Sequence, residues 1–232
     1  MSAAQFILDP IGFMTQNIIL TDLVSAQETN PGNSDVRRFT LDLLTHVVGV
    51  TPVYRLMDLP HVWPIPRDHF RAYWCPYKPD HQLGTMLEGD ASYMFTAVMS
   101  GCSLGIGSAT QNGGRGVFHA NMASVGKLKD PNDAQNPKKV RKAVGQQMKE
   151  QKKKLLHMLV PEQNIIDPTF YGDGIGESKF GSTVAYEVKL KSTTMGIRAT
   201  TGQWTFYTLR YRRLNGGKTY EHHGLHPFNT IV

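Results

Sequence analysis

Two strand-like segments separated by a glycine-rich turn constrain the fold of this chain more than any other feature. Ser103–Gly107 precedes the turn at residues 107–114, and Val117–Val125 follows it. Directly upstream, Tyr93–Met99 is apolar on both faces, which is typical of a strand that is covered on both sides. We therefore predict adjacent strands in the core of a mixed α/β protein, with helices covering part of that core.

Hydrophobic periodicity predicts the other elements. Apolar residues at helical spacing favour a helix over Ser34–Val48, and Asn136 followed by Pro137 is a typical start for a second, longer helix. Repeated prolines argue against a long regular element between Thr51 and Pro79. Three more strands are predicted from β-branched and aromatic residues bounded by turn signals: Ser182–Leu190, Thr194–Thr200 and Trp204–Arg213.

Composition indicates one folded domain. The chain has 232 residues, of which 40% are hydrophobic and 19% charged, and such values are typical of a globular protein. Because no Ser/Gly-rich linker divides it, we predict a single domain over residues 1–232. No apolar run approaches the roughly 18 residues that span a bilayer, and Met1–Gln16 lacks the basic start of a secretory signal. Cys75 and Cys102 are too few for a disulfide framework, so we expect a reducing compartment.

Basic residues are concentrated in one part of the chain. The net charge is +6, and Lys138–Lys154 is rich in lysine, with Glu150 as its one acidic residue. Such a stretch attracts nucleic acid, an anionic membrane or an acidic protein surface, and it is also typical of a solvated helix face. A module that binds nucleic acid or a host protein without catalysis is therefore one alternative.

Cys102 and His119 are the candidate catalytic residues. Cys102 ends a Ser-Gly turn, and a thiol beside an imidazole forms an activated nucleophile, since the imidazole takes the thiol proton. If the strands on either side of residues 107–114 pair symmetrically, Cys102 lies opposite His119, with Cβ atoms about 5 Å apart. The turn residues whose backbone N–H groups we expect to form an oxyanion hole are Ser100, Gly101 and Ser103.

This segment resembles the cysteine-dependent glutamine deamidase toxins, the family of the cytotoxic necrotizing factor catalytic domain and of Burkholderia lethal factor. The family has a Leu-Ser-Gly-Cys type motif that precedes a catalytic histidine. Here the motif is Met-Ser-Gly-Cys at residues 99–102, and His119 follows it. Thr96 lies six residues before Cys102, where lethal factor also has a threonine. The resemblance covers residues 96–119.

The resemblance implies a fold and a reaction. The implied fold is a central β-sandwich, largely antiparallel, with flanking helices and long loops. In the implied reaction, His119 takes the Cys102 proton, the thiolate attacks a glutamine carboxamide of a host protein, and water hydrolyses the thioester to glutamate. Thr96 matches the position of a third catalytic group. The reaction needs no cofactor and no metal.

The resemblance also implies a setting. We expect a single catalytic domain that is a monomeric toxin or effector, secreted from a bacterium without a recognisable signal peptide and active in the host cytosol. The family precedents for the substrate are Rho-type GTPases and a translation-initiation RNA helicase. The same dyad also suits a transglutaminase, in which an amine replaces water, or a cysteine peptidase.

Two other motifs are weaker candidates for a site. The histidines of residues 222–226 have the close spacing of metal ligands, but few acids accompany them, so a surface turn is favoured over a metal site. Glycine alternates in residues 172–176 as in dinucleotide-binding loops, but no strong strand precedes this segment and no helical pattern follows. We favour a loop there, bordering the active site.

Overall fold

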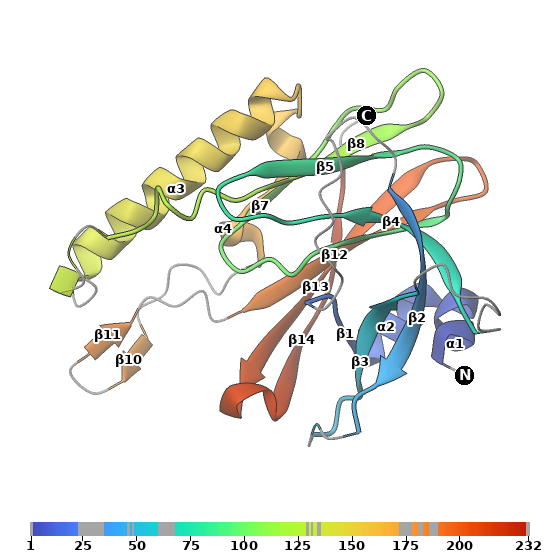
Figure 1. Cartoon of the computed structure of the whole chain (residues 1–232), viewed down its shortest axis with the longest axis horizontal. Helices are drawn as coiled ribbons and strands as arrows, with labels where there is room; N and C mark the ends of the chain where they lie inside the picture. The colour runs from blue at the N-terminus through green and yellow to red at the C-terminus, as the bar shows by residue number, and fades with distance from the viewer. Residues whose placement is uncertain are drawn as a thin grey trace.

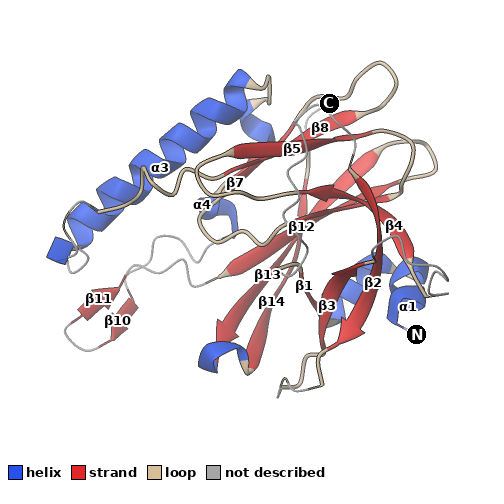
Figure 2. Ribbon diagram, in the orientation of Figure 1, coloured by secondary structure: helices blue, strands red, loops and turns tan. Residues whose placement is uncertain are grey.

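The protein is a mixed α/β fold built on two β-sheets with helices around them, as predicted (Figure 1 and Figure 2). The computed structural model describes residues 2–22, 35–45, 47, 49–59, 68–128, 130, 132–133, 136–171, 178–180, 183–185 and 190–230. Most strand pairs in this part of the chain are antiparallel.

The larger sheet has eight strands, and its two parallel pairs are β1 with β3 and β4 with β6. Because β4 and β6 are central and buried, they carry large apolar side chains on both faces. In spatial order the strands are β1 (Ile18–Leu20), β3 (Val53–Asp58), β2 (Val36–Leu43), β4 (Phe70–Cys75), β6 (Tyr93–Thr96), β12 (Lys191–Arg198), β13 (Trp204–Leu214) and β14 (Thr219–Phe228).

The smaller sheet has four strands and lies across the larger one (Figure 1). Its spatial order is β5 (Gln82–Leu87), β8 (Arg115–Ala120), β7 (Ser103–Ile106) and β9 (Ile165–Ile166). A separate hairpin pairs β10 (Ser178–Phe180) with β11 (Thr183–Ala185). Short 3-10 helices include η2 (Glu162–Asn164) and η3 (Asn215–Gly217).

The helices cover the sheets from two sides (Figure 2). α1 (Ser2–Leu8) and α2 (Pro10–Gln16) lie on the larger sheet, whereas α3 (Pro137–His157) and the short α4 (Pro168–Tyr171) lie beside the smaller one. The start of α3 is as predicted, since the Asn136 side chain accepts hydrogen bonds from the backbone N–H groups of Lys138 and Lys139.

The core is divided between the two sides of the larger sheet. One cluster packs α1 and α2 onto it, with Phe6 and Met14 against Phe39 and Trp74. A second cluster fills the space between the two sheets: Tyr73, Met94 and Phe206 from the larger sheet meet Leu104, Ile106 and Val117 from the smaller one. Two sheets facing each other across an apolar layer make a sandwich-like core.

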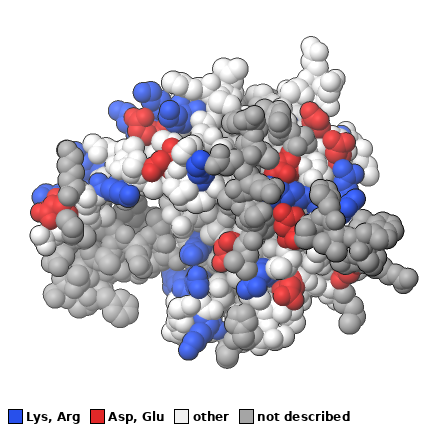
Figure 3. All heavy atoms as spheres, in the orientation of Figure 1, with Lys and Arg blue, Asp and Glu red and all other residues white. Residues whose placement is uncertain are grey.

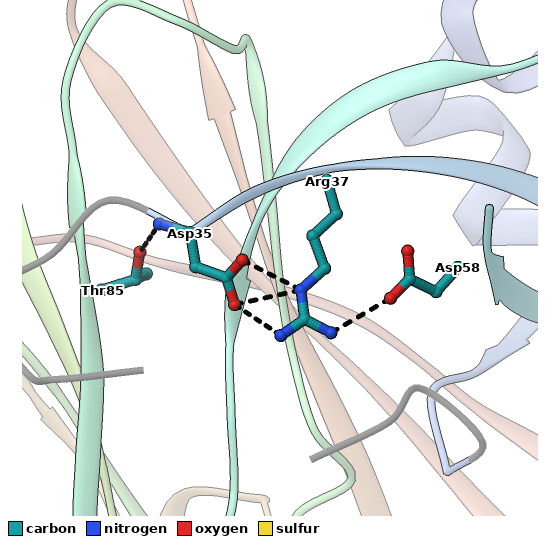
Figure 4. Close-up of polar contacts among 4 residues, drawn as sticks. All are labelled: Asp35, Arg37, Asp58 and Thr85. Carbon is teal, nitrogen blue, oxygen red and sulfur yellow. Dashed lines mark hydrogen bonds and ion pairs between the residues drawn. The ribbon is translucent and has the colours of Figure 1, made fainter. Parts of the chain in front are cut away.

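A polar cluster also joins the sheets (Figure 4). The Arg37 guanidinium binds both carboxylate oxygens of Asp35 and, through Nη1, Asp58 at 3.1 Å. The Asp35 backbone N–H donates to Thr85 Oγ1 on β5 at 3.0 Å. The cluster therefore connects β2 and β3 of the larger sheet with β5 of the smaller sheet.

One predicted element is wrong. Ser34–Val48 is not helical but contains β2, because Phe39 and Leu41 alternate into the core while Thr40 and Asp42 do not. Strand pairing on both sides of β2 outweighs the helical spacing of its apolar residues. The described part of Thr51–Pro79 contains no long regular element, in agreement with the prediction; it holds two six-residue strands, β3 and β4, and the prolines lie outside them.

Other predicted elements are confirmed, with different ends. β7, β13 and α3 form where predicted, while β6 stops at Thr96 and β8 stops at Ala120. Met99 pairs with Ser192 only through an isolated bridge. The predicted turn at residues 222–226 is part of β14. Residues 172–177 and most of the predicted strand Ser182–Leu190 lie outside the described residues.

Candidate functional site

The turn that carries Cys102 is held in place by a tyrosine hydroxyl. Gly101 has a φ of +100°, a left-handed conformation that favours glycine. Its backbone N–H donates to Tyr171 Oη at 2.8 Å, and the same hydroxyl donates to the Cys102 carbonyl at 2.8 Å. Tyr171 belongs to α4 and is fully buried, so this clamp fixes the turn from inside the protein.

Gln151 of α3 holds the other side of the turn. Its Nε2 donates to the Gly101 carbonyl at 2.8 Å, and its Oε1 accepts a hydrogen bond from Ser103 Oγ at 2.8 Å. Both Gln151 and Ser103 are buried. The side chain of Ser103 and the backbone of Gly101 are therefore engaged in supporting the turn.

The Cys102 thiol lines a cavity of about 300 Å³. The side chain is only 2% exposed, so a partner reaches the sulfur through this cavity. Apolar and polar groups share its walls, which is typical of a small-ligand or side-chain pocket. The lining residues are Thr21, Asp22, Trp74, Tyr77, Ala97, Val98, Ser100, Cys102, Asn121 and Lys191.

Burial and hydrogen bonding act on the thiol in opposite directions. Burial raises the pKa of Cys102, whereas hydrogen bonds from the Asn121 side chain and the Ser100 backbone N–H lower it, and the net effect is upward. The resting group is therefore a neutral thiol at pH 7. Ser100 itself is exposed and lies at the wall of the cavity.

The predicted pairing of Cys102 with His119 is wrong by two residues. β7 and β8 pair with Leu104 opposite His119 and Ser103 opposite Ala120. Extending this register by one residue places Cys102 beside Asn121, and Asn121 Nδ2 lies 3.0 Å from Cys102 Sγ.

The asymmetry of the turn explains the shift in register. Thr110 donates to the Gly114 carbonyl and Gly113 donates to the Thr110 carbonyl, so the innermost turn is centred one residue later than a symmetric loop over residues 107–114 predicts. Moving the centre by one residue moves every cross-strand partner by two. His119 remains on the same face of β8 as Asn121, because side chains alternate along a strand.

His119 is buried next to the cavity without a polar partner. Its side chain is 1% exposed, and neither ring nitrogen has a hydrogen-bond partner in the described part of the chain. Its ring lies 5.4 Å from the ring of Tyr77, centroid to centroid, and Tyr77 lines the cavity. Burial lowers the pKa of His119 to about 4, so the imidazole is neutral at pH 7 and keeps a lone pair free to accept a proton.

Thr96 lies in β6 and is fully buried. Its Oγ1 accepts a hydrogen bond from the Thr194 backbone N–H at 3.0 Å, and since both His119 nitrogens lack partners among the described residues, Thr96 is not hydrogen-bonded to that ring. The position thus supports the contact between β6 and β12. A catalytic role for Thr96 stays a prediction.

Asn121 is the residue of this site that the sequence interpretation missed. It follows β8 directly, it is 6% exposed, and it lines the cavity together with Cys102. The sequence does carry a signal, because in the triplet His-Ala-Asn at residues 119–121 the outer two side chains share one face of a strand.

Cys75 has a different environment from Cys102. It is buried in the layer between the sheets and does not line the cavity. Its thiol donates weakly to the Val117 carbonyl at 3.7 Å, and burial raises its pKa strongly. We therefore regard Cys75 as a core residue and as a natural control for Cys102 chemistry.

The described residues hold neither a cluster of metal ligands nor a helix suited to span a membrane. No cluster of three or more His, Cys, Asp or Glu side chains is arranged around a common point there. His222 instead contacts the Met14 carbonyl through Nε2 at 2.9 Å, which ties β14 to α2. None of the described helices combines the length and the apolar character needed to cross a bilayer.

Comparison with known protein families gave no matching family model, and comparison with curated proteins gave no matching relative.

Proposed function

We propose that this chain is a cysteine-dependent protein-glutamine deamidase that acts as a bacterial toxin or effector, with Cys102 as its nucleophile. The observation that carries the proposal is the placement of the Cys102 thiol in the wall of the cavity, with hydrogen-bond donors directed at the sulfur. The resemblance of residues 96–119 to the deamidase toxins supports the same assignment.

His119 is the proposed general base. A neutral imidazole accepts a proton, and its buried nitrogens have no competing partner among the described residues. No hydrogen bond joins His119 to Cys102 in this structure. Catalytic hydrogen bonds are often long in a free enzyme and tighten when substrate binds, so we place formation of the Cys102–His119 contact in the complex.

The reaction then follows from the two groups. His119 takes the thiol proton as Cys102 Sγ attacks the carboxamide carbon, and the carbonyl oxygen becomes an oxyanion. The C–N bond breaks as His119 returns the proton to the nitrogen, and ammonia leaves a thioester on Cys102. Water, deprotonated by His119, attacks the thioester and releases glutamate and the thiol.

The depth of the thiol favours a side-chain amide over a backbone peptide bond. Cys102 is 2% exposed, so a slender glutamine side chain reaches it more readily than the main chain of a folded protein does. Trp74 and Tyr77 offer apolar surface to the methylene groups of that side chain. Deamidation therefore suits the cavity better than proteolysis. A transglutaminase reaction differs only in the final nucleophile, an amine in place of water.

The substrate and setting rest on the resemblance. We propose a host protein as substrate, with Rho-type GTPases and a translation-initiation RNA helicase as the precedents, and the host cytosol as the place of action. Cys75 and Cys102 are both free thiols, which suits a reducing compartment.

A binding module is the second candidate, and α3 supplies the observation for it. Figure 3 shows basic side chains spaced along this helix. Lys138, Lys142, Lys149 and Lys153 are exposed, and their spacing places them on one helix face. Binding of RNA that weakens with salt and is unaffected by Cys102→Ala would favour this candidate.

The test of the proposal is intact-mass analysis of candidate host proteins after incubation with the wild-type chain, Cys102→Ser or Cys75→Ser. Conversion of one glutamine to glutamate adds about one dalton and releases ammonia without cleaving the backbone. We expect the mass gain with wild type and with Cys75→Ser, and no gain with Cys102→Ser. A shorter product would indicate a peptidase, and an added amine would indicate a transglutaminase.

A further inference from the structure

Of the backbone N–H groups expected to hold an oxyanion, that of Gly101 is already engaged in supporting the turn. The Gly101 backbone N–H donates to Tyr171, and the Ser103 hydroxyl donates to Gln151. The Ser100 N–H is directed at the Cys102 sulfur. A thioester mechanism at this site therefore gains from a further donor beside the sulfur that holds the charge developing on the carbonyl oxygen.

Asn121 presents a donor at the required place, and its orientation is determined by its other contacts. Its Oδ1 accepts hydrogen bonds from the backbone N–H groups of Ala123 at 3.0 Å and Asp80 at 3.2 Å. A flipped amide would direct its NH₂ group at these two donors, so the hydrogen-bond network fixes Nδ2 on the side of Cys102. The Asn121 backbone N–H also donates to the His81 carbonyl at 3.0 Å.

The nitrogen has a hydrogen to spare. Nδ2 carries two hydrogens, and Cys102 Sγ at 3.0 Å is its one acceptor in the described part of the chain. Asn121 also lines the cavity, so the group is open to a ligand that enters there. An oxygen bonded to the carbon that Sγ attacks lies beside the sulfur, within reach of a donor that already contacts the sulfur.

We infer that Asn121 is a catalytic residue that donates its side-chain N–H to the oxyanion of the tetrahedral intermediate. The inference rests on the proposed function, because the oxyanion forms when Cys102 attacks a carboxamide. The Asn121 side-chain N–H group contacts the thiolate before the attack and the oxyanion after it. The same amide therefore stabilises negative charge first on the sulfur and then on the oxygen. Such a preorganised donor acts mainly on kcat, since it binds the transition state better than the substrate.

The experiment compares Asn121→Ala and Asn121→Asp with the wild-type chain. Asn121→Asp keeps the shape of the side chain and the acceptor for Asp80 and Ala123, but it replaces the donor at the sulfur with an acceptor. Ammonia release is measured with an N-blocked glutaminyl-glycine dipeptide. The matched control is Asn17→Ala, because Asn17 also uses its amide inside the protein, donating to the Phe13 carbonyl at 2.7 Å at the end of α2.

We expect both Asn121 variants to lose about 10²- to 10³-fold in kcat with little change in KM, as for loss of one oxyanion donor. The midpoint of the pH profile for Cys102 alkylation by iodoacetamide should also move upward in both, because the thiolate loses a hydrogen bond. Asn17→Ala should change neither quantity. If Asn121 had only a structural role, its variants would have lower thermal stability but would not show a reduced kcat at an unchanged KM.

The outcomes separate the two proposals. If the wild-type chain releases ammonia and a folded Asn121→Asp variant has a kcat within about threefold of wild type, the proposed role of Asn121 is overturned. The deamidase proposal then still stands. An absence of ammonia release in wild type, on the dipeptide and on host proteins alike, would overturn both. If Asn121→Ala does not fold, the result for Asn121→Asp decides the test, because the aspartate retains the Oδ1 contacts with the backbone N–H groups of Asp80 and Ala123.

Discussion

At the scale of single residues, the proposed chemistry depends on two buried titratable side chains. Cys102 has a raised pKa and His119 has a pKa of about 4. Moving a proton from the thiol to the imidazole is therefore unfavourable in the free protein, and the resting pair is neutral. In the proposed mechanism, substrate binding therefore brings the two groups together before the thiolate forms.

The burial of His119 predicts how stability depends on pH. The pKa of an unfolded histidine is about 6.5, and that of His119 in the folded state is about 4. Between these values the unfolded chain binds the proton and the folded chain does not. Protonation of this histidine in the unfolded chain should therefore lower the free energy of unfolding by roughly 3 kcal/mol as pH drops from 7 to 4. The loss should level off below pH 4.

The measurement is urea unfolding of wild type and His119→Leu at several pH values. The variant lacks the titrating ring, so the difference in unfolding free energy between the two proteins should change over this range by the same roughly 3 kcal/mol. The control is His157→Leu on the exposed side of α3. If the unfolding free energies of wild type and His119→Leu change in parallel with pH, His119 is not buried as a neutral group.

The two cysteines should differ in reactivity. The Cys102 thiol is open to the cavity and has a raised pKa, so its alkylation by iodoacetamide should be slow at pH 7 and should accelerate as pH rises. Cys75 should react only after unfolding. Mass spectrometry of Cys75→Ser and Cys102→Ser isolates each thiol. Fast labelling of Cys102 with a plateau below pH 7 would instead indicate a resting thiolate–imidazolium pair.

At the scale of elements, α3 and α4 hold the turn that carries Cys102 from its two sides. Tyr171 bridges Gly101 and Cys102 with a single hydroxyl. Replacing Tyr171 with Phe leaves a buried N–H and a carbonyl without their partner. We expect a loss of about 1–3 kcal/mol in the free energy of unfolding and a fall in kcat. The control is Tyr54→Phe, whose ring packs on Phe13 on the far side of the larger sheet.

Urea unfolding and the deamidation assay together test this role of Tyr171. Unchanged stability and unchanged kcat in Tyr171→Phe would show that the hydroxyl does not fix the turn.

The turn itself makes a second test at this scale. A Cβ added at Gly101 meets nothing within 4 Å, so the substitution Gly101→Ala is opposed by backbone strain alone. We expect about 1–2 kcal/mol of destabilisation, since φ is +100° there. Thermal unfolding measures the effect, and Gly145→Ala on α3, where a Cβ also has space, is the matched control with the opposite sign. Equal stability of Gly101→Ala and wild type would mean that the turn relaxes to another conformation.

Local signals predicted some elements and not others. α3 was predictable because Asn136 and Pro137 form a capping pair that needs no tertiary contact. β2 was not, because its apolar residues fit a helical and a strand period alike, and pairing with β3 and β4 decided between them. The hairpin was predicted but its register was not, since it depends on the hydrogen bonds inside the turn.

At the scale of the whole molecule, the cavity is assembled from distant parts of the chain. Thr21 follows β1, Trp74 lies in β4, Asn121 follows β8 and Lys191 begins β12. Strand order and the packing of the two sheets bring these residues together. The sequence pattern singled out Cys102 and His119 as candidates because they flank one hairpin, whereas the cavity and the position of Asn121 beside Cys102 depend on contacts between segments that no local pattern records.

The most direct test of the account is the deamidation of a host protein by the whole chain, followed by intact mass. We predict a gain of about one dalton per converted glutamine with wild type and with Cys75→Ser, and none with a folded Cys102→Ser. Equal mass gain with Cys102→Ser and wild type, in preparations with equal thermal stability, would contradict the assignment of Cys102 as the nucleophile.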